Sequence, residues 1–291
     1  MSDWLLSPLS YGFMQRGLLA ALMVGVLCAV VGCYVVLRSM AFLGDAMAHA
    51  VLPGVAVAYL LGANLTFGAL AAALIVALGI GFFSRQGLVK EDTAIGIAFT
   101  AALALGIALI SSIRTYAVDL SHILFGNVLG VNVNDLWLTA ILGALVLVVM
   151  ILAYKPFLLI SFDPVLAATL HLRVEFFRSL MLVLISVTIV VSIQTVGVGL
   201  VAAMLVTPAA TAYLLTRRLP TMMAISAGIG ALSSIVGLYA SYYLNIASGA
   251  AVVLAATLIF FLAFLFAPQR GMLWGSARIF MGDRAKSREG D

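Results

Sequence analysis

The sequence predicts an all-α fold, a polytopic transmembrane bundle of about eight or nine spans. Apolar residues make up 65% of the 291 residues and charged residues only 9%, whereas soluble domains are about 45–50% apolar and about 25% charged. Mean hydropathy is +1.23. Apolar runs of bilayer-crossing length recur along the chain, and in lipid such runs form helices because every backbone polar group needs an internal partner.

The apolar runs divide the chain into one membrane domain, residues 17–267, between two shorter end segments. Segment 1–16 is amphipathic and contains Pro8, so we expect it to lie along the membrane interface. The basic segment 268–291 is expected to form a cytoplasmic tail. The predicted spans, in order, are 17–37, 43–62, 66–84, 93–112, 135–154, 180–197, 199–216, 221–243 and 249–267.

The least certain part of this pattern is 180–216, which fits either one long kinked helix or two crossings that meet near Gly197 and Gly199. Charge favours two crossings. With them, every Lys and Arg except Arg16 and Arg114 falls on one side of the membrane, and the positive-inside rule assigns that side to the cytoplasm. The same rule explains the net charge of +4, so we expect no nucleic-acid partner.

One predicted span carries a pair of ionisable residues. Asp45 and His49 are four positions apart and therefore share a helix face. Ionisable groups inside a membrane are costly and commonly mark functional sites. Carboxylate oxygen with imidazole nitrogen suits Mn²⁺, Fe²⁺ or Zn²⁺, but a proton relay or a structural hydrogen bond between the two residues fits the spacing as well. Pro53 and Gly54 should weaken the helix just beyond them.

A second signal lies after the fifth span. Asp163 followed by Pro164 is typical of a helix N-cap with proline in the first turn. The predicted helix, 164–172, is too short to cross the bilayer and lies on the cytoplasmic side by the charge pattern. It is either an ordinary interfacial helix or a helix that inserts into a groove of a soluble partner.

Other polar residues give weaker signals. Asp119 and His122 are candidates for the outer mouth of a pathway, or belong to a solvated loop. Gln194, Thr195 and Thr207 are candidates to line the pathway, or satisfy backbone groups that Gly and Pro leave unpaired.

Acidic side chains begin the span 93–112. We expect Glu91, Asp92 and Thr93 to cap that helix. No Walker phosphate loop, HExxH helix or GxSxG elbow occurs in the sequence, so we do not expect the chain to be an enzyme.

The segment Leu37–Gly54 resembles the signature of the ABC-3 family of metal-importer permeases. Segments 91–97, 119–126, 162–164 and 194–212 resemble further parts of that family, so the similarity covers nearly the whole chain. The 194–212 region is more similar to manganese- and iron-type members than to zinc-type members.

The resemblance implies a type II ABC-importer-like permease in the bacterial inner membrane, with no permanently bound cofactor. It implies that Asp45 and His49 coordinate the transported metal, Mn²⁺ first and Fe²⁺ or Zn²⁺ next. It also implies partners: a second permease copy or a paired permease, cytoplasmic ATPase subunits that alone bind ATP, and an extracytoplasmic metal-binding protein. The coupling segment, about 163–173, would dock on the ATPase through Asp163, Pro164, Leu166, Ala167, Leu170, Leu172 and Arg173.

Two other functions remain open at this point. A proton-coupled secondary carrier would use Asp45 and His49 as a relay and would need no ATPase. A siderophore or cobalamin permease of related architecture would not need a paired acid and imidazole.

Overall fold

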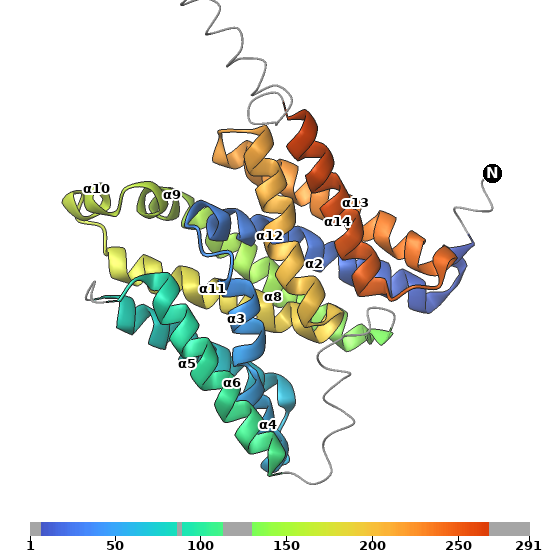
Figure 1. The fold of residues 1–291 in the computed structure, drawn as a ribbon, viewed down its shortest axis with the longest axis horizontal. Helices are drawn as coiled ribbons and strands as arrows, with labels where there is room; N and C mark the ends of the chain where they lie inside the picture. The colour runs from blue at the N-terminus through green and yellow to red at the C-terminus, as the bar shows by residue number, and fades with distance from the viewer. Residues whose placement is uncertain (1–6, 86–88, 113–129, 268–291) are drawn as a thin grey trace, which may run out of the picture.

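A computed structural model describes residues 7–85, 89–112 and 130–267, and its regular elements are helices (Figure 1). In chain order they are η1 (Pro8–Ser10), α2 (Gly12–Leu37), α3 (Leu43–Ala50), α4 (Leu52–Leu60), α5 (Leu65–Arg85), α6 (Glu91–Ser111), α8 (Val133–Leu152), α9 (Tyr154–Phe162), α10 (Pro164–Thr169), α11 (Val174–Val196), α12 (Val198–Leu215), α13 (Leu219–Leu244) and α14 (Ser248–Phe266).

Within the described ranges, nine helical stretches are long and apolar enough to cross a membrane, with α3 and α4 together forming one of them. The predicted all-α multi-pass fold is therefore confirmed. The region 180–216 contains two helices, α11 and α12, which meet at Gly197 with φ 86° and ψ 162°. Residues with a Cβ rarely adopt this conformation, so glycine fixes the position of the break.

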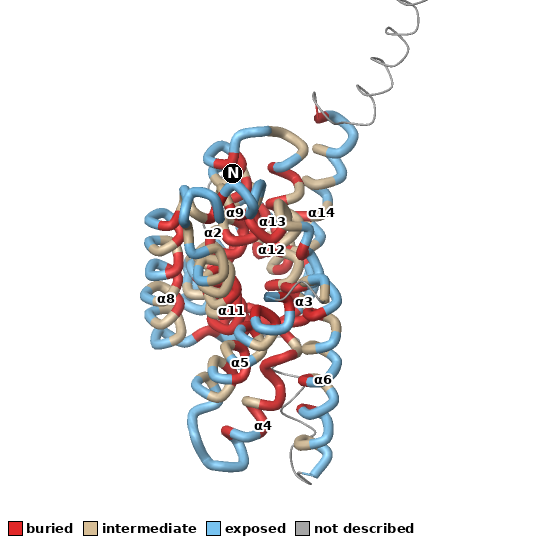
Figure 2. The backbone as a smooth tube through the Cα atoms, turned by 90° about the vertical axis from the view of Figure 1, so that its left-hand side faces the viewer, coloured by how far each residue is buried: buried red, intermediate tan, exposed pale blue. Residues whose placement is uncertain are grey.

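The centre of the bundle is formed by α2, α11, α12 and α3, and the outer helices are mostly exposed (Figure 2). Helix α2 packs against α13, α12, α11 and α8. Its glycines allow close approach: a Cβ added to Gly25 would lie 3.0 Å from the carbonyl oxygen of Gly230, and one added to Gly32 only 1.7 Å from that of Leu205. Small residues at such contacts are the usual means of helix association in lipid.

Helices α4, α5 and α6 form a group at one side of the molecule (Figure 1). Gly54 of α4 and Gly68 of α5 bring two backbones together, because a Cβ on Gly54 would lie 2.1 Å from the carbonyl oxygen of Gly68. Helices α9 and α10 lie at another edge, beside the beginning of α11 (Figure 1).

Several boundaries differ from the sequence-based prediction, among them the start of α11, which lies at Val174 instead of residue 180. Helix α2 begins at Gly12, inside the predicted interfacial segment. A separate helix, α9, occupies 154–162, where the sequence analysis predicted no helix. Helix α10 ends at Thr169 rather than at 172, and His171 just beyond it has φ 58°, a left-handed conformation that does not continue a helix.

Candidate metal site

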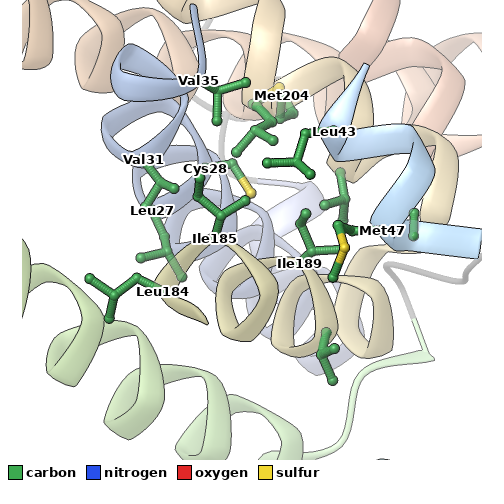
Figure 3. Close-up of a cluster of buried hydrophobic side chains, with 14 of the residues drawn as sticks. Leu27, Cys28, Val31, Val35, Leu43, Met47, Leu184, Ile185, Ile189 and Met204 are labelled. Atoms are coloured by element: carbon green, nitrogen blue, oxygen red, sulfur yellow. The ribbon is translucent and has the colours of Figure 1, made fainter. Parts of the chain in front are cut away.

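Helix α3 is a buried helix with two accessible residues. Six of its eight residues are buried; the exceptions are Asp45 and His49. The buried face packs into the apolar core, where Leu43 and Met47 lie near Ile185 and Ile189 of α11 and Met204 of α12 (Figure 3). That packing fixes the orientation of α3 and leaves the acid and the imidazole on its open face.

The two side chains lie close together. The Oδ1 atom of Asp45 is 3.7 Å from Nε2 of His49, and the exposed fractions of these side chains are 48% and 28%. The separation is longer than a hydrogen bond but within the reach of an ion pair. Their oxygen and nitrogen lone pairs remain accessible at one place on the surface of the helix.

Aromatic rings border this pair. The ring of Phe99 on α6 lies 6.0 Å from the imidazole of His49, centroid to centroid, and 5.6 Å from the ring of Phe42, edge to face. Phe42 precedes α3 and Phe99 comes from a different span. The imidazole therefore has an apolar neighbour that limits its orientation and lowers the local polarity.

The helix that carries the pair ends next to it. Helix α3 ends at Ala50, Val51 forms a turn, and α4 begins at Leu52 with Pro53 in its first turn. Proline has no amide hydrogen to give to the carbonyl four residues earlier, which here is that of His49. The predicted weakening of the helix by Pro53 is thus confirmed.

Two ligands do not complete a site for a transition metal. Within 7–85, 89–112 and 130–267, no group of three or more His, Cys, Asp or Glu side chains is arranged to hold a metal ion. Asp45 and His49 can supply one oxygen and one nitrogen. Apart from residues outside the described ranges, further ligands would have to be water, backbone oxygen or residues from another chain.

The predicted coupling segment lies apart from this pair, at the edge formed by α9 and α10 (Figure 1). The carboxylate of Asp163 accepts a hydrogen bond from the amide of Leu166 at 2.9 Å, which confirms the predicted N-cap. Most of α10 is exposed, including the apolar side chains of Val165 and Leu166, whereas Ala167 is buried. Leu170, directly after the helix, is exposed as well. Leu172 is half-buried and Arg173 is exposed.

The candidate pathway residues differ from one another. Gln194 is exposed, whereas Thr195 is buried and its hydroxyl donates to the carbonyl of Ser192 at 3.0 Å. The carbonyl of Thr207 accepts from the hydroxyl of Thr211 at 2.7 Å, next to Pro208. Both hydroxyl groups donate to a carbonyl three or four residues earlier in their own helix, and the assignment of Gln194, Thr195 and Thr207 to the pathway stays a prediction. Asp119 and His122 lie outside the described residues.

The sequence analysis missed an ion-pair cluster. Glu91, expected to cap α6, instead contacts Arg38 at 2.7 Å and Arg178 at 3.2 Å. The cap residue is Lys90, without a side-chain cap bond. The partners of Glu91 are 53 and 87 positions away in the sequence, so no local pattern could have identified them. The only indication in the sequence was that residues of opposite charge stand near the ends of the predicted spans.

Comparison with known proteins places this architecture in a family. The model of the ABC 3 transport family matches residues 10–267. A manganese transport system membrane protein of Halalkalibacterium halodurans, MntC, is 51% identical over 96% of this chain and 94% of its own length. A Haemophilus influenzae protein described as a probable iron transport system membrane protein is 39% identical over 93% of this chain and 99% of its own.

A solved structure agrees with these sequence relatives. PsaBC from Streptococcus pneumoniae, determined in complex with Fab, superposes with a TM-score of 0.82 at 40% identity, covering 93% of this chain and 98% of the other. Nine stretches of the described residues are long and apolar enough to cross a membrane, and the relatives above are membrane proteins of transport systems, so this is a multi-pass inner-membrane protein. With a family model over most of its length and relatives of this similarity, the chain belongs to the ABC 3 transport family, as a permease of the ABC-importer type.

Proposed function

We propose that this permease carries Mn²⁺ into the cytoplasm, driven by ATP hydrolysis in a separate subunit. The observation that carries the proposal is the Asp45–His49 pair, whose side chains lie 3.7 Å apart on the accessible face of a buried helix. The manganese relative supports Mn²⁺ as the first cargo. Fe²⁺ and Zn²⁺ suit the same oxygen and nitrogen donors.

The ion is held by two copies of the chain in this mechanism. Asp45 and His49 from each copy meet near a two-fold axis, which supplies the ligands that the described part of a single copy lacks. The carboxylates offset the charge of the cation inside the membrane, where an uncompensated charge is costly. Neutral imidazoles donate nitrogen, and the small number of strong ligands lets the ion leave again.

Transport then follows alternating access. An extracytoplasmic metal-binding protein delivers the ion to the outer side, and ATP binding and hydrolysis move the cytoplasmic ATPase subunits. The exposed apolar side chains of α10 provide a surface against which those subunits can pack. Their motion passes through the coupling segment, 163–173, and changes the side of the membrane to which the ion has access.

The test is metal uptake by proteoliposomes that contain the permease with its ATPase partner. Asp45→Asn and His49→Ala should each lower ATP-dependent ⁵⁴Mn²⁺ uptake by about 100-fold or more, because even loss of an outer-shell partner costs about 10- to 100-fold in a metal site. Asp92→Asn is the matched control, since Asp92 is exposed and has no ion pair with a described residue.

Three results would contradict the proposal. Uptake by Asp45→Asn at the wild-type rate would show that the carboxylate of Asp45 does not bind the transported metal. Uptake without ATP that stops when a protonophore is added would indicate a proton-coupled carrier. Competition by bulky metal chelates, but not by free Mn²⁺, would indicate a chelate permease.

A further inference from the structure

The carboxylate of Glu91 joins three helices through two arginines. Its Oε2 atom lies 2.7 Å from Nη2 of Arg38 and 3.2 Å from Nη2 of Arg178, and the Nε–H of Arg178 donates to Oε1 at 3.2 Å. Arg178 therefore contacts both carboxylate oxygens, a two-point geometry that fixes direction as well as distance. We call these three residues the arginine–glutamate cluster.

The cluster is nearly shielded from solvent. The exposed fractions of the side chains are 10% for Arg38, 15% for Glu91 and 19% for Arg178. Removing one member of such a pair leaves a buried charge without compensation, which is strongly destabilising for that arrangement. The cluster thus favours one relative position of its three helices far more than an exposed ion pair would.

Each member stands at a helix end that faces the predicted cytoplasmic side. Arg38 directly follows α2, Glu91 is the first residue of α6, and Arg178 lies about one turn into α11. Helix α10 comes just before α11 and contacts it. A displacement of the coupling segment (163–173) therefore reaches Arg178 over a short and continuous stretch of chain.

Two connections lead from the cluster to the metal pair. Along α6, Phe99 lies about 12 Å above Glu91 and contacts the imidazole of His49. Along the chain, Arg38 is joined by residues 39–42 to α3, and Phe42 in that connection also contacts Phe99. Glu91 is the common point of both, because it holds the beginning of α6 against Arg38 while it binds Arg178.

We propose that Glu91 is a positioning residue that transmits the motion of the coupling segment to the Asp45–His49 pair. While the cluster is intact, a shift of the start of α11 displaces α6 and α3 with it. Without the carboxylate, α11 moves while the metal pair stays behind, so ATP is hydrolysed without transport. This inference rests on the proposed function and adds a route by which the two sites communicate.

The experiment measures two rates in the same proteoliposomes of the permease–ATPase complex: ⁵⁴Mn²⁺ uptake and phosphate release. Glu91→Gln keeps the shape of the side chain and removes its charge. It should lower the number of ions moved per ATP about tenfold, within the range typical for the coupling of two sites, at an unchanged KM for Mn²⁺. Because the ratio does not depend on the amount of complex, mere loss of folded protein would leave it unaltered.

Asp92→Asn is the matched control, because it removes one negative charge from the same turn of α6 at an exposed position outside the cluster. Its ratio of ions to ATP should equal that of the wild type. Arg178→Gln provides an independent variant should Glu91→Gln not assemble, since it breaks only the contact with α11 and leaves the Arg38–Glu91 pair. It should show the same loss of coupling.

The outcomes separate this inference from the proposed function. A wild-type complex that moves no Mn²⁺ with ATP overturns the proposed function and this inference with it. A wild-type complex that transports, together with a Glu91→Gln or Arg178→Gln complex of wild-type ratio, overturns the inference alone. An equal loss in Asp92→Asn also overturns it, because the charge rather than the cluster would then matter.

Discussion

Gly32 of α2 and Leu205 of α12 touch so closely that a Cβ atom on Gly32 would lie 1.7 Å from the carbonyl oxygen of Leu205. Gly32→Ala must therefore push apart two helices at the centre of the bundle. We expect a loss of more than about 3 kcal/mol, above the usual cost of overpacking, because the obstacle is backbone. Thermal unfolding of the detergent-solubilised protein, followed by size-exclusion chromatography, measures the effect. Gly79→Ala is the control, since its Cβ meets nothing within 4 Å.

The Asp45–His49 pair should behave as one unit. Because both side chains bind the same ion in our proposal, removing either destroys the site and removing both adds little. The double variant Asp45→Asn/His49→Ala should therefore bind and transport Mn²⁺ no worse than the poorer single variant. Uptake rates and isothermal titration of Mn²⁺ provide the comparison. Losses that multiply in the double variant would mean that the two residues act at separate places.

Phe99 should affect metal binding without being a ligand. Its ring lies against His49 and Phe42, so Phe99→Leu frees the imidazole to rotate. We expect a KM for Mn²⁺ several-fold higher, in line with about 0.5–1.5 kcal/mol for a specific aromatic contact. Phe83→Leu is the control, because Phe83 is exposed on α5 and contacts Phe82. A KM unchanged by Phe99→Leu would contradict the expectation.

The exposed face of α10 should bind the ATPase. Leu170, the residue that directly follows α10, is 59% exposed, and Leu170→Asp should reduce the ATPase retained on an affinity-tagged permease by about tenfold or more. Asp163→Ala should have a weaker effect, since loss of an N-cap costs about 1 kcal/mol. Asp163→Asn should restore binding because asparagine is an equally good cap. Retention that does not change with Leu170→Asp would exclude this docking surface.

Gly197 should be irreplaceable by residues with a side chain. Its φ of 86° with ψ of 162° costs other residues about 1–3 kcal/mol. Gly197→Ala should lower the thermal stability accordingly, and Gly199→Ala, two residues on, should not, because its Cβ enters open space. The midpoint of thermal unfolding, measured for both variants, tests this prediction. Equal midpoints for Gly197→Ala and Gly199→Ala would contradict it.

Much of this fold was predictable because its determinants are local. Long apolar runs located the membrane helices to within a few residues, since hydrocarbon leaves the backbone few alternatives to a helix. The proximity of Asp45 and His49 was also predictable, because four residues make one helical turn. The N-cap at Asp163 could be predicted from two adjacent residues, Asp163 and Pro164.

What the sequence did not reveal depends on distant parts of the chain. Glu91 looked like a capping residue, and its arginines became its partners only when three helix ends met. Helix α9 was missed because Lys155 and Pro156 interrupt the apolar pattern, although proline is tolerated in a first turn. The contact of Phe99 with His49 likewise required knowledge of which spans are neighbours.

The junction of α3 and α4 has an electrostatic consequence. His49 lies in the last turn of α3, and α4 begins only three residues after it. The partial negative charge at the end of α3 is therefore offset by the partial positive charge at the start of α4. Compensation for a divalent ion beside His49 must then come from the carboxylate of Asp45 and from ligands outside this helix pair.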